Sequence, residues 1–236
     1  MKKIALAIFS CFLILAATAQ KTYSDKNAQA RNVQGFHGIK VSNGIHLYLS
    51  QGNEEAVAVS ASSQEYIDRI KTEVVNGVLK IYYENNMKPW NNNGKSLRAY
   101  VSCKELDLLK ANSGAEVEVD GTIKSGTLSF DFSSGAQFDG RVESTTLKVD
   151  QNSGAEAKVS GTATNFTFDA SSGATFRGYD LTTDHCDASA SSGASLKVTV
   201  NKELAASASS GGQIYFKGTG VIKDISTSSG GEVSRR

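Results

Sequence analysis

Residues 146–161 read TLKVDQNSGAEAKVSG, and this stretch decides the fold because copies of it recur along the second half of the chain. Its Ser-Gly-Ala centre occurs five times and is followed by two Ser-Gly-Gly copies. The central glycines are Gly114, Gly135, Gly154, Gly173, Gly193, Gly211 and Gly230. Successive glycines are 18 to 21 residues apart. A period near 20 is typical of a solenoid, in which each coil buries its apolar face only against its neighbours.

The positions around each glycine alternate between apolar and polar in every copy. The position three residues after the glycine is apolar in every copy: Val117, Phe138, Ala157, Phe176, Leu196, Ile214 and Val233. The position five residues before it is also apolar: Leu109, Phe130, Val149, Phe168, Ala188, Ala206 and Ile225. The positions two and four before the glycine are polar. Side chains alternate between the two faces of a strand. The sequence therefore predicts an all-β fold, a parallel β-solenoid with coils of about 19–20 residues.

The Ser-Gly-Ala centre is predicted to be a structural corner of each coil. By the same alternation its serine and its alanine should both face the core, and its glycine should lie in a tight, stacked position. A second turn, such as Asp139-Gly140 or Ser160-Gly161, follows the short strand in most copies. Each coil should therefore contain at least two strands and two corners.

Composition sets limits on the partners and the redox chemistry. The 236 residues carry a net charge of +1. A nearly neutral chain does not indicate binding to nucleic acid. The glycines lack GxGxxG or GKS spacing, so no nucleotide cofactor is expected. Cys103 and Cys186 remain after the N-terminal leader described next. A disulfide between them is compatible with an oxidising compartment, but two buried free thiols are favoured because Cys186 falls on an apolar position of the repeat.

The N-terminal residues predict export. Residues 1–19 combine two lysines, an apolar run and the small residues Ala17-Thr18-Ala19, a pattern typical of a signal peptide cleaved between Ala19 and Gln20. The apolar run is short for a membrane span, so no transmembrane segment is expected in the mature chain. The polar residues 20–34 are predicted to form a loose tail. The mature protein should reach the periplasm, the outer-membrane surface or the medium.

Residues 35–236 are predicted to form one domain with two parts. Residues 35–103 are β-rich but lack the Ser-Gly-Ala phrase, and they should continue or cap the solenoid of residues 104–236. A loop within the first part carries Trp90, the single tryptophan, among several asparagines. Trp90, together with Tyr82, Tyr83 and Tyr100, could stack on sugars or contact proteins. Alternatively, these aromatic residues cover the open end of the solenoid, whose last strand would otherwise be an unpaired edge.

The chain resembles the head GIN domain family. The resemblance rests on residues 36–41 (FHGIKV), residues 44–52 (GIHLYLSQG), residues 74–81 (VVNGVLKI) and the run of Ser-Gly-Ala coils. It covers about residues 36–220. The family is known as auto-transporter adhesins and is common among secreted proteins of Bacteroidetes. The resemblance implies a right-handed parallel β-helix and no enzymatic activity, and it carries over no catalytic residues.

The sharpest polar candidate is a column of aspartates. Asp131, Asp150 and Asp169 occupy the same position in successive repeats, so their carboxylates should lie near one another. Such a column could hold a hard cation or serve a glycosidase, which needs a pair of carboxyl groups around a sugar cleft. The sequence lacks the glycine and aspartate pattern of the known Ca²⁺-binding repeat. It also lacks the long loop insertions that would build a cleft. A solvated binding face is therefore favoured, with no metal and no catalytic residues.

These observations predict a non-enzymatic, exported β-solenoid of the bacterial cell envelope that works as an adhesin or binding protein. Its partner would be a protein or a glycan at the cell surface. Two alternatives stay open. One is a carbohydrate-active β-helix enzyme, a polysaccharide lyase or a glycosidase. The other is a structural envelope component that associates with itself through its C-terminal edge, as a homo-oligomer.

Overall fold

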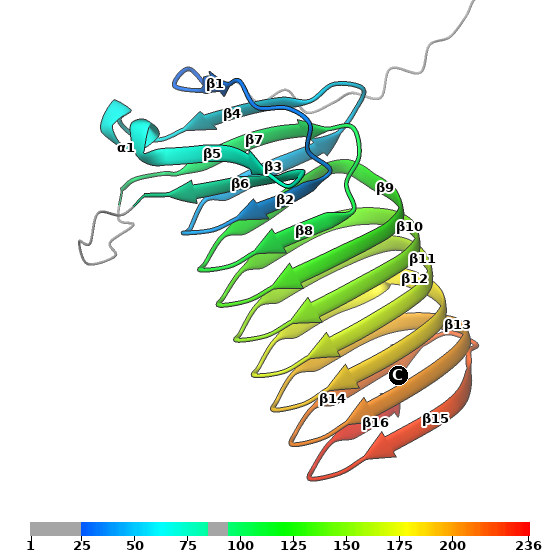
Figure 1. The fold of residues 1–236 in the computed structure, drawn as a ribbon. Helices are drawn as coiled ribbons and strands as arrows, with labels where there is room; N and C mark the ends of the chain where they lie inside the picture. The colour runs from blue at the N-terminus through cyan, green and yellow to red at the C-terminus, as the bar shows by residue number, and fades with distance from the viewer. Residues whose placement is uncertain (1–24, 85–93) are drawn as a thin grey trace, which may run out of the picture.

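The protein is a β-solenoid. The computed structural model describes residues 25–84 and 94–236. Strands make up 66% of the chain and helix 3%, arranged as about 7 stacked coils of about 19 residues. The predicted all-β solenoid is therefore confirmed. Figure 1 shows the coils stacked from the N-terminal elements at one end to β15 and β16 at the other.

Five long strands form the body of the solenoid. They are β9 (Glu116–Phe132), β10 (Gln137–Gln151), β11 (Glu156–Ala170), β12 (Thr175–Ala190) and β13 (Ser195–Ala208). Each pairs in parallel with the next, in the order β9, β10, β11, β12, β13. The last coils are built from β14 (Gln213–Lys217), β15 (Val221–Thr227) and β16 (Glu232–Arg235). Equivalent residues of successive repeats therefore lie side by side.

The second predicted corner is a bend rather than a turn. Each long strand runs through it without ending and curves from one face of the coil to the other (Figure 1). The pairing register shifts at Asp139/Arg141 and at Lys158/Gly161, which marks a bulge at the bend. Gly161 has a φ of +110°, and a Cβ there would overlap the carbonyl oxygen of Val142. Glycine is therefore required at this bend.

The Ser-Gly-Ala corners are tight turns whose serine and glycine both have positive φ. In one copy φ is 52° at Ser153 and 71° at Gly154, the combination found in a type I′ turn. Ala155 is fully buried, whereas Ser153 is exposed. The prediction that the serine faces the core is wrong, because two left-handed residues interrupt the strand alternation on which it relied. Nothing lies within 4 Å of a Cβ built on Gly154, so the tight stacked position predicted for this glycine is also wrong.

Backbone hydrogen bonds connect each corner to the next. The amide of Gly154 donates to the carbonyl of Ser172 at 3.0 Å, and the same bond recurs from Gly114 to Ser134 and from Gly193 to Ser210. Within a corner, the amide of Ala155 donates to the carbonyl of Asn152 at 3.2 Å. The corners therefore form a ladder of their own along the solenoid. At these corners the glycines contribute through their backbone conformation and not through close packing.

The N-terminal part both continues the solenoid and closes its end. Its elements are β1 (Gln29–Arg31), β2 (Gly38–Val41), β3 (His46–Gln51), β4 (Ala56–Ser60), α1 (Gln64–Arg69), β5 (Ile70–Val75), β6 (Val78–Tyr83), β7 (Arg98–Cys103) and β8 (Leu108–Ala111). β2 lies in parallel between β6 and β8, and β3 lies in parallel between β7 and β9. β4 and β5 pair antiparallel with β7 and β6 and so end the parallel stacking. β1 pairs with β4, so residues 29–31 are not part of a loose tail.

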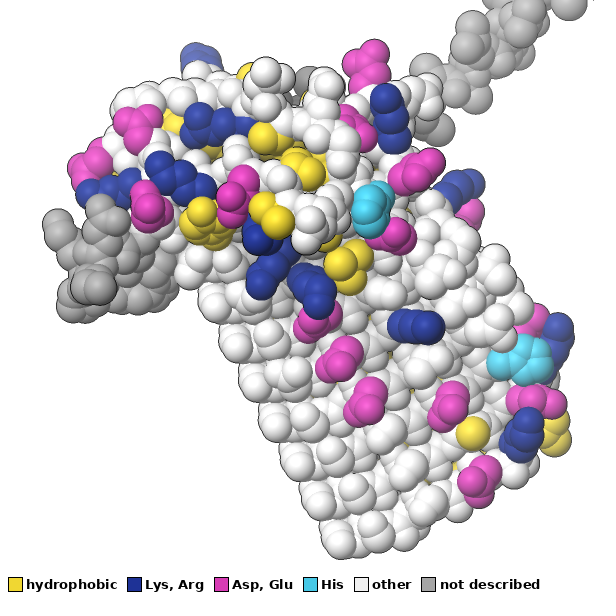
Figure 2. Space-filling view, viewed as in Figure 1, with side chains coloured by type: hydrophobic (Ala, Val, Ile, Leu, Met, Phe, Trp, Pro, Cys, Tyr) yellow, Lys and Arg dark blue, Asp and Glu magenta, His cyan; other side chains and the backbone are white. Residues whose placement is uncertain are grey.

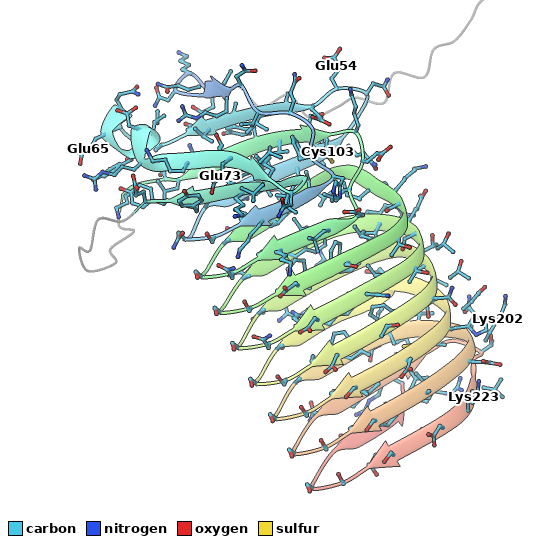
Figure 3. All side chains as sticks on the ribbon, in the orientation of Figure 1. Glu54, Glu65, Glu73, Cys103, Lys202 and Lys223 are labelled. Atoms are coloured by element: carbon cyan, nitrogen blue, oxygen red, sulfur yellow. The ribbon has the colours of Figure 1, made fainter. Side chains whose placement is uncertain are left out.

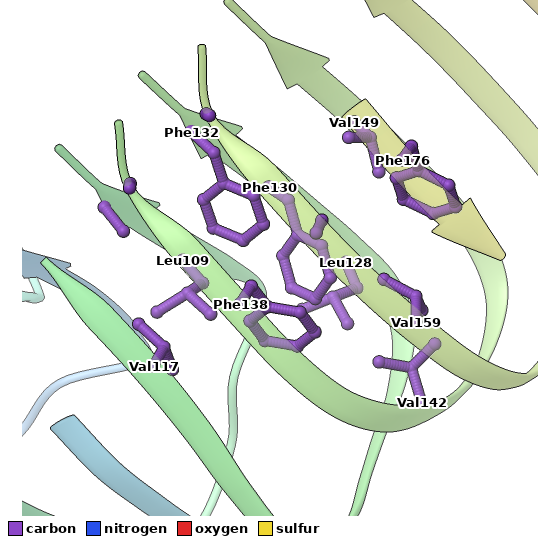
Figure 4. Close-up of a cluster of buried hydrophobic side chains, with 14 of the residues drawn as sticks. Leu109, Val117, Leu128, Phe130, Phe132, Phe138, Val142, Val149, Val159 and Phe176 are labelled. Atoms are coloured by element: carbon purple, nitrogen blue, oxygen red, sulfur yellow. The ribbon is translucent and has the colours of Figure 1, made fainter. Parts of the chain in front are cut away.

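The core is a continuous apolar column inside the coils. Phe130, Phe132 and Phe138 pack with ring centroids 4.9–5.3 Å apart (Figure 4). The apolar positions predicted from the repeat are buried, except for Ile225 and Val233 in the last coils. Cys103 and Cys186 are both buried, free thiols, so the favoured interpretation of the cysteines is confirmed. Burial raises the pKa of Cys103 to about 11 and that of Cys186 to about 12.

Candidate functional site

The predicted aspartate column exists. Asp150 pairs in register with Asp131 of β9 and with Asp169 of β11. All three side chains lie on the outer face of the sheet, and adjacent strands place them about 4.7–4.9 Å apart. Figure 3 shows side chains standing in such rows across the coils. The regular pairing of β9, β10 and β11 therefore presents three carboxylates as a straight, exposed row.

The structure extends this row with lysines. Lys110 of β8 pairs in register with Asp131, and its Nζ lies 2.7 Å from Asp131 Oδ2. Lys40 of β2 stacks on Lys110, and Lys80 of β6 stacks on Lys40. We call the six residues Lys80, Lys40, Lys110, Asp131, Asp150 and Asp169 the lysine–aspartate ladder. Figure 2 shows basic side chains near the N-terminal end of this face and acidic ones below them.

Sequence reasoning identified the acidic half of the ladder and missed most of the basic half. The missing signal was a short pattern, a lysine between two apolar residues, in Ile39-Lys40-Val41, Leu79-Lys80-Ile81 and Leu109-Lys110-Ala111. Without the Ser-Gly-Ala phrase, residues 35–103 gave no alignment that could place Lys40 and Lys80 on the column. Strand pairing in the structure supplies that alignment.

The acidic half of the ladder is electrostatically strained. The pKa of Asp150 is raised, first by partial desolvation of its carboxyl and then by the charges of Asp131 and Asp169 on either side. A like charge directly opposite on a neighbouring strand is destabilising. The three neighbouring aspartates therefore do not stabilise the fold.

No metal centre forms from these carboxylates in the part of the chain that the structure describes. Within residues 25–84 and 94–236, no group of three His, Cys, Asp or Glu side chains is placed to hold a metal ion. The aspartates lie along a line, one per coil, whereas Ca²⁺ takes 6–8 oxygen ligands around a centre.

A shallow hollow lies on the other face of the coils, which the first half of each long strand forms before the bend. It has a volume of about 260 Å³ and is lined by Glu116, Glu118, Asp139, Glu156, Lys158 and Arg177, among others. The Nζ of Lys158 lies 3.0 Å from an oxygen of Asp139, and Arg177 lies 3.1 Å from a carboxylate oxygen of Glu156. These carboxylates are thus paired with cations on the next coil. That pairing differs from the acid pair around a cleft that a glycosidase needs.

An aromatic stack lies beside this hollow. The ring centroids of His46 and Tyr48 are 4.2 Å apart, and those of Tyr48 and Tyr100 are 5.2 Å apart. The Tyr100 hydroxyl donates to Asp25 at 2.9 Å. Burial and this carboxylate raise the pKa of Tyr100 to about 12. The sequence analysis included Tyr100 among the aromatic contact candidates but not His46 or Tyr48. Tyr48 and Tyr100 occupy outward positions of two strands that pair in register.

The aromatic contact site predicted around Trp90 is only partly described. Trp90 lies outside the described residues, as do Ala19 and Gln20 of the predicted cleavage site. Tyr82 is partly exposed on β6. Tyr83 is 3% exposed and belongs to the core, with Lys95 Nζ 4.8 Å from the centroid of its ring. Tyr83 is therefore not a surface contact residue, because strand alternation turns it to the inner face.

The described residues contain no helix long and apolar enough to cross a membrane. A search of curated proteins finds no match. A family model described as "Putative auto-transporter adhesin, head GIN domain" matches residues 35–220.

Solved structures from related folds are similar over nearly the whole chain. A putative adhesin from Bacteroides fragilis superposes with a TM-score of 0.76 at 16% identity, over 89% of this chain and 96% of that one. A putative adhesin from Parabacteroides merdae gives 0.66 at 13%, over 89% and 95%. A putative lipid binding protein from Parabacteroides distasonis gives 0.65 at 18%, over 90% and 98%. At these identities the likeness shows the fold alone.

Proposed function

The chain belongs to the head GIN domain family, and we propose that it is a non-enzymatic binding protein, an adhesin, of the bacterial cell envelope. The family and the neighbouring structures carry adhesin names, which is consistent with binding as the activity. The pattern of residues 1–19 supports export through a signal peptide.

The observation that carries the proposal is the lysine–aspartate ladder. Backbone pairing spaces its charged residues regularly, so a partner with charges at the same spacing can contact several of them at once. Small polar residues flank the acidic half on the same face, among them Ser133, Asn152 and Ser171. A flat, charged face with small neighbours is accessible to a large partner, either a protein or a glycan.

A carbohydrate-active enzyme is the less favoured candidate. An inverting or retaining glycosidase places two carboxyl groups on either side of a bound sugar. The ladder places its carboxylates in one line on a flat face. In the hollow, Asp139 and Glu156 pair with Lys158 and Arg177. Glu116 and Glu118 lie 3.6 and 3.7 Å from the ring nitrogens of His46. Neither arrangement supplies an unpaired acid facing a second carboxylate across a cleft.

A binding assay on the purified chain tests the proposal. Residues 20–236 would be applied to a glycan array and to intact bacterial and host cells, together with a variant carrying Asp131→Asn, Asp150→Asn and Asp169→Asn. We expect the wild-type chain to bind and the variant to bind at least several-fold more weakly. A control with Asp187→Asn removes a carboxylate of the same sheet outside the ladder and should bind like wild type. Equal binding by all three proteins would contradict a role for the ladder.

A further inference from the structure

We propose that the lysine–aspartate ladder binds a second copy of this chain, with the two solenoids face to face and running in opposite directions. The inference rests on the proposed binding function and names the partner. It follows from the order of charges along the ladder, three lysines and then three aspartates on six consecutive strands: β6, β2, β8, β9, β10 and β11.

The ladder is self-complementary under a two-fold rotation. Consider a two-fold axis that runs parallel to the strands, between β8 and β9, in the plane where the two copies touch. Rotation about it turns the second copy to face the first and reverses the order of its rungs. Lys110 then lies opposite the partner copy's aspartate at position 131, and Lys40 and Lys80 lie opposite positions 150 and 169. Because neighbouring strands are evenly spaced, the three lysine–aspartate pairs and their three symmetry mates can all form at the same time.

The outer charges of the ladder form no ion pairs within the described part of one copy. Lys110 and Asp131 form an ion pair at 2.7 Å, but Lys40, Lys80, Asp150 and Asp169 form no ion pair among the described residues. The pKa of Asp150 is raised by partial desolvation and then by repulsion from Asp131 and Asp169, and a lysine from a second copy would offset that repulsion. The row of like charges opposes stability within one copy, and cations opposite it would offset this cost.

The columns beside the ladder are compatible with close approach. In the same arrangement Ser133 lies opposite Asn112, Asn152 opposite Ser42, and Ser171 opposite Tyr82. On the other side, Lys148 faces Gly38, which carries no charge. Glu73 of β5, next to Lys80, faces the uncharged Ser189 of β12. Among the described residues of these strands, no like charges lie directly opposite each other.

Charge reversal tests this partner. Residues 20–236 would be studied by analytical ultracentrifugation over a wide concentration range, and we expect a monomer–dimer equilibrium. The variant Asp150→Lys with Asp169→Lys makes the ladder basic at nearly every rung, and the variant Lys40→Glu with Lys80→Glu makes it mostly acidic. Each variant alone should dimerise about tenfold more weakly or worse, because four exposed ion pairs become repulsive.

Mixing the two variants is the decisive measurement. Their ladders are complementary, so the mixture should form a heterodimer at least as stable as the wild-type dimer. The association should also weaken in about 1 M salt, where the Debye length falls to about 3 Å. A variant with Lys202→Glu and Lys223→Glu, which changes charges outside the ladder (Figure 3), should dimerise like wild type. Circular dichroism would confirm that every variant is folded.

The outcomes separate this inference from the proposed function. A wild-type chain that stays monomeric at all concentrations overturns the inference, and so does a mixture of variants that fails to associate. If that monomer still binds cells or glycans through its aspartates, the binding function stands and the occupant of the ladder is another molecule. If the chain dimerises through the ladder but binds no cell bearing the same protein, the adhesin function fails and the inference stands.

Discussion

The serine and glycine at each corner are held in the left-handed region, which side chains other than glycine adopt at a cost. Serine tolerates it in every copy, with φ between 48° and 54°. In the two degenerate copies Gly212 and Gly231 replace the usual alanine, and a Cβ at either would overlap the carbonyl oxygen of Ala190 or Ala208. With this backbone, glycine is required at the third position of both Ser-Gly-Gly corners.

Replacing Gly154 with alanine should destabilise the protein by about 1–2 kcal/mol, because a non-glycine residue pays that cost at positive φ. Nothing lies near the added Cβ, so the cost is conformational and not steric. Denaturant unfolding monitored by circular dichroism measures it. Gly126→Ala is the matched control, since Gly126 also has open space around it but no positive φ. An equal loss in both variants would refute the conformational explanation.

Replacing Asp150 with asparagine should stabilise the monomer at pH 7 by about 0.2–1 kcal/mol, because it removes like charges opposite one another on adjacent strands. The pKa of Asp150 is raised in the folded state, so the folded state binds the proton more tightly than the unfolded state. The native charge therefore costs stability above the raised pKa, and this cost disappears as the pH falls below the ordinary value of 3.8. The gain from Asp150→Asn should disappear in the same range.

Thermal unfolding at low protein concentration, between pH 7 and pH 3, measures this effect. Asp187→Asn serves as its control, because the register partners of Asp187 are Thr167 and Ala205, which carry no charge. A gain for Asp150→Asn that stays constant across the pH range would show that repulsion is not its cause.

At the residue level, the sequence predicted the positions that recur in every repeat. The aspartate column and the apolar columns could be aligned on the recurring glycine, and both are in register as expected. The orientation of the serine could not be predicted by counting, since one turn with two positive φ angles resets the alternation. Lys40 and Lys80 were missed because no repeated phrase connects their strands to the others.

At the scale of the strand, one long element replaces the two short strands and a turn that the sequence suggested. The turn dipeptides, such as Asp139-Gly140, mark bends within continuous strands. The glycines correctly indicated an irregularity of the backbone, but glycine is typical of both bulges and turns. Only the hydrogen bonds to the neighbouring coils distinguish them, and those come from strands about 19 residues away in the chain.

Core packing between successive strands depends on alternating side-chain size. Phe138 lies in register between Val117 and Ala157, so a large ring is flanked by smaller neighbours. Phe138→Ala should cost about 3–5 kcal/mol, since the cavity would lie beside the rings of Phe130 and Phe132. Urea unfolding measures this loss. Phe138→Leu fills most of the space and should lose much less; equal losses would contradict packing as the cause.

At the scale of the molecule, the two ends of the solenoid differ. The N-terminal end is closed by antiparallel pairing of β4 and β5 and by β1, whereas every residue of β15 is exposed. Val221, Ile222 and Ile225 are among the most exposed large apolar residues, with 69%, 49% and 38% of their surface accessible. Stability should therefore decrease from the middle of the solenoid towards β15.

Native-state hydrogen exchange can map that gradient. Amides of β10, β11 and β12, which are paired on both sides, should exchange only through global unfolding. Amides of β15 should exchange fastest among the strands of the repeat, through opening of the last coils alone. Mass spectrometry of peptides after timed exchange measures this, and a uniform rate along the solenoid would contradict it.

The in-register stacking of β9, β10 and β11 has a consequence for how such a protein could change over evolution. Large and small core residues alternate from coil to coil, so an in-frame duplication of the two coils of residues 137–174 would insert two more layers that keep this alternation. Such a duplication would lengthen the molecule by about 10 Å and add two carboxylates, at positions 150 and 169 of the new copy, to the row. The reach of the molecule and the length of its charge pattern would thus grow together in fixed steps, with no redesign of the core.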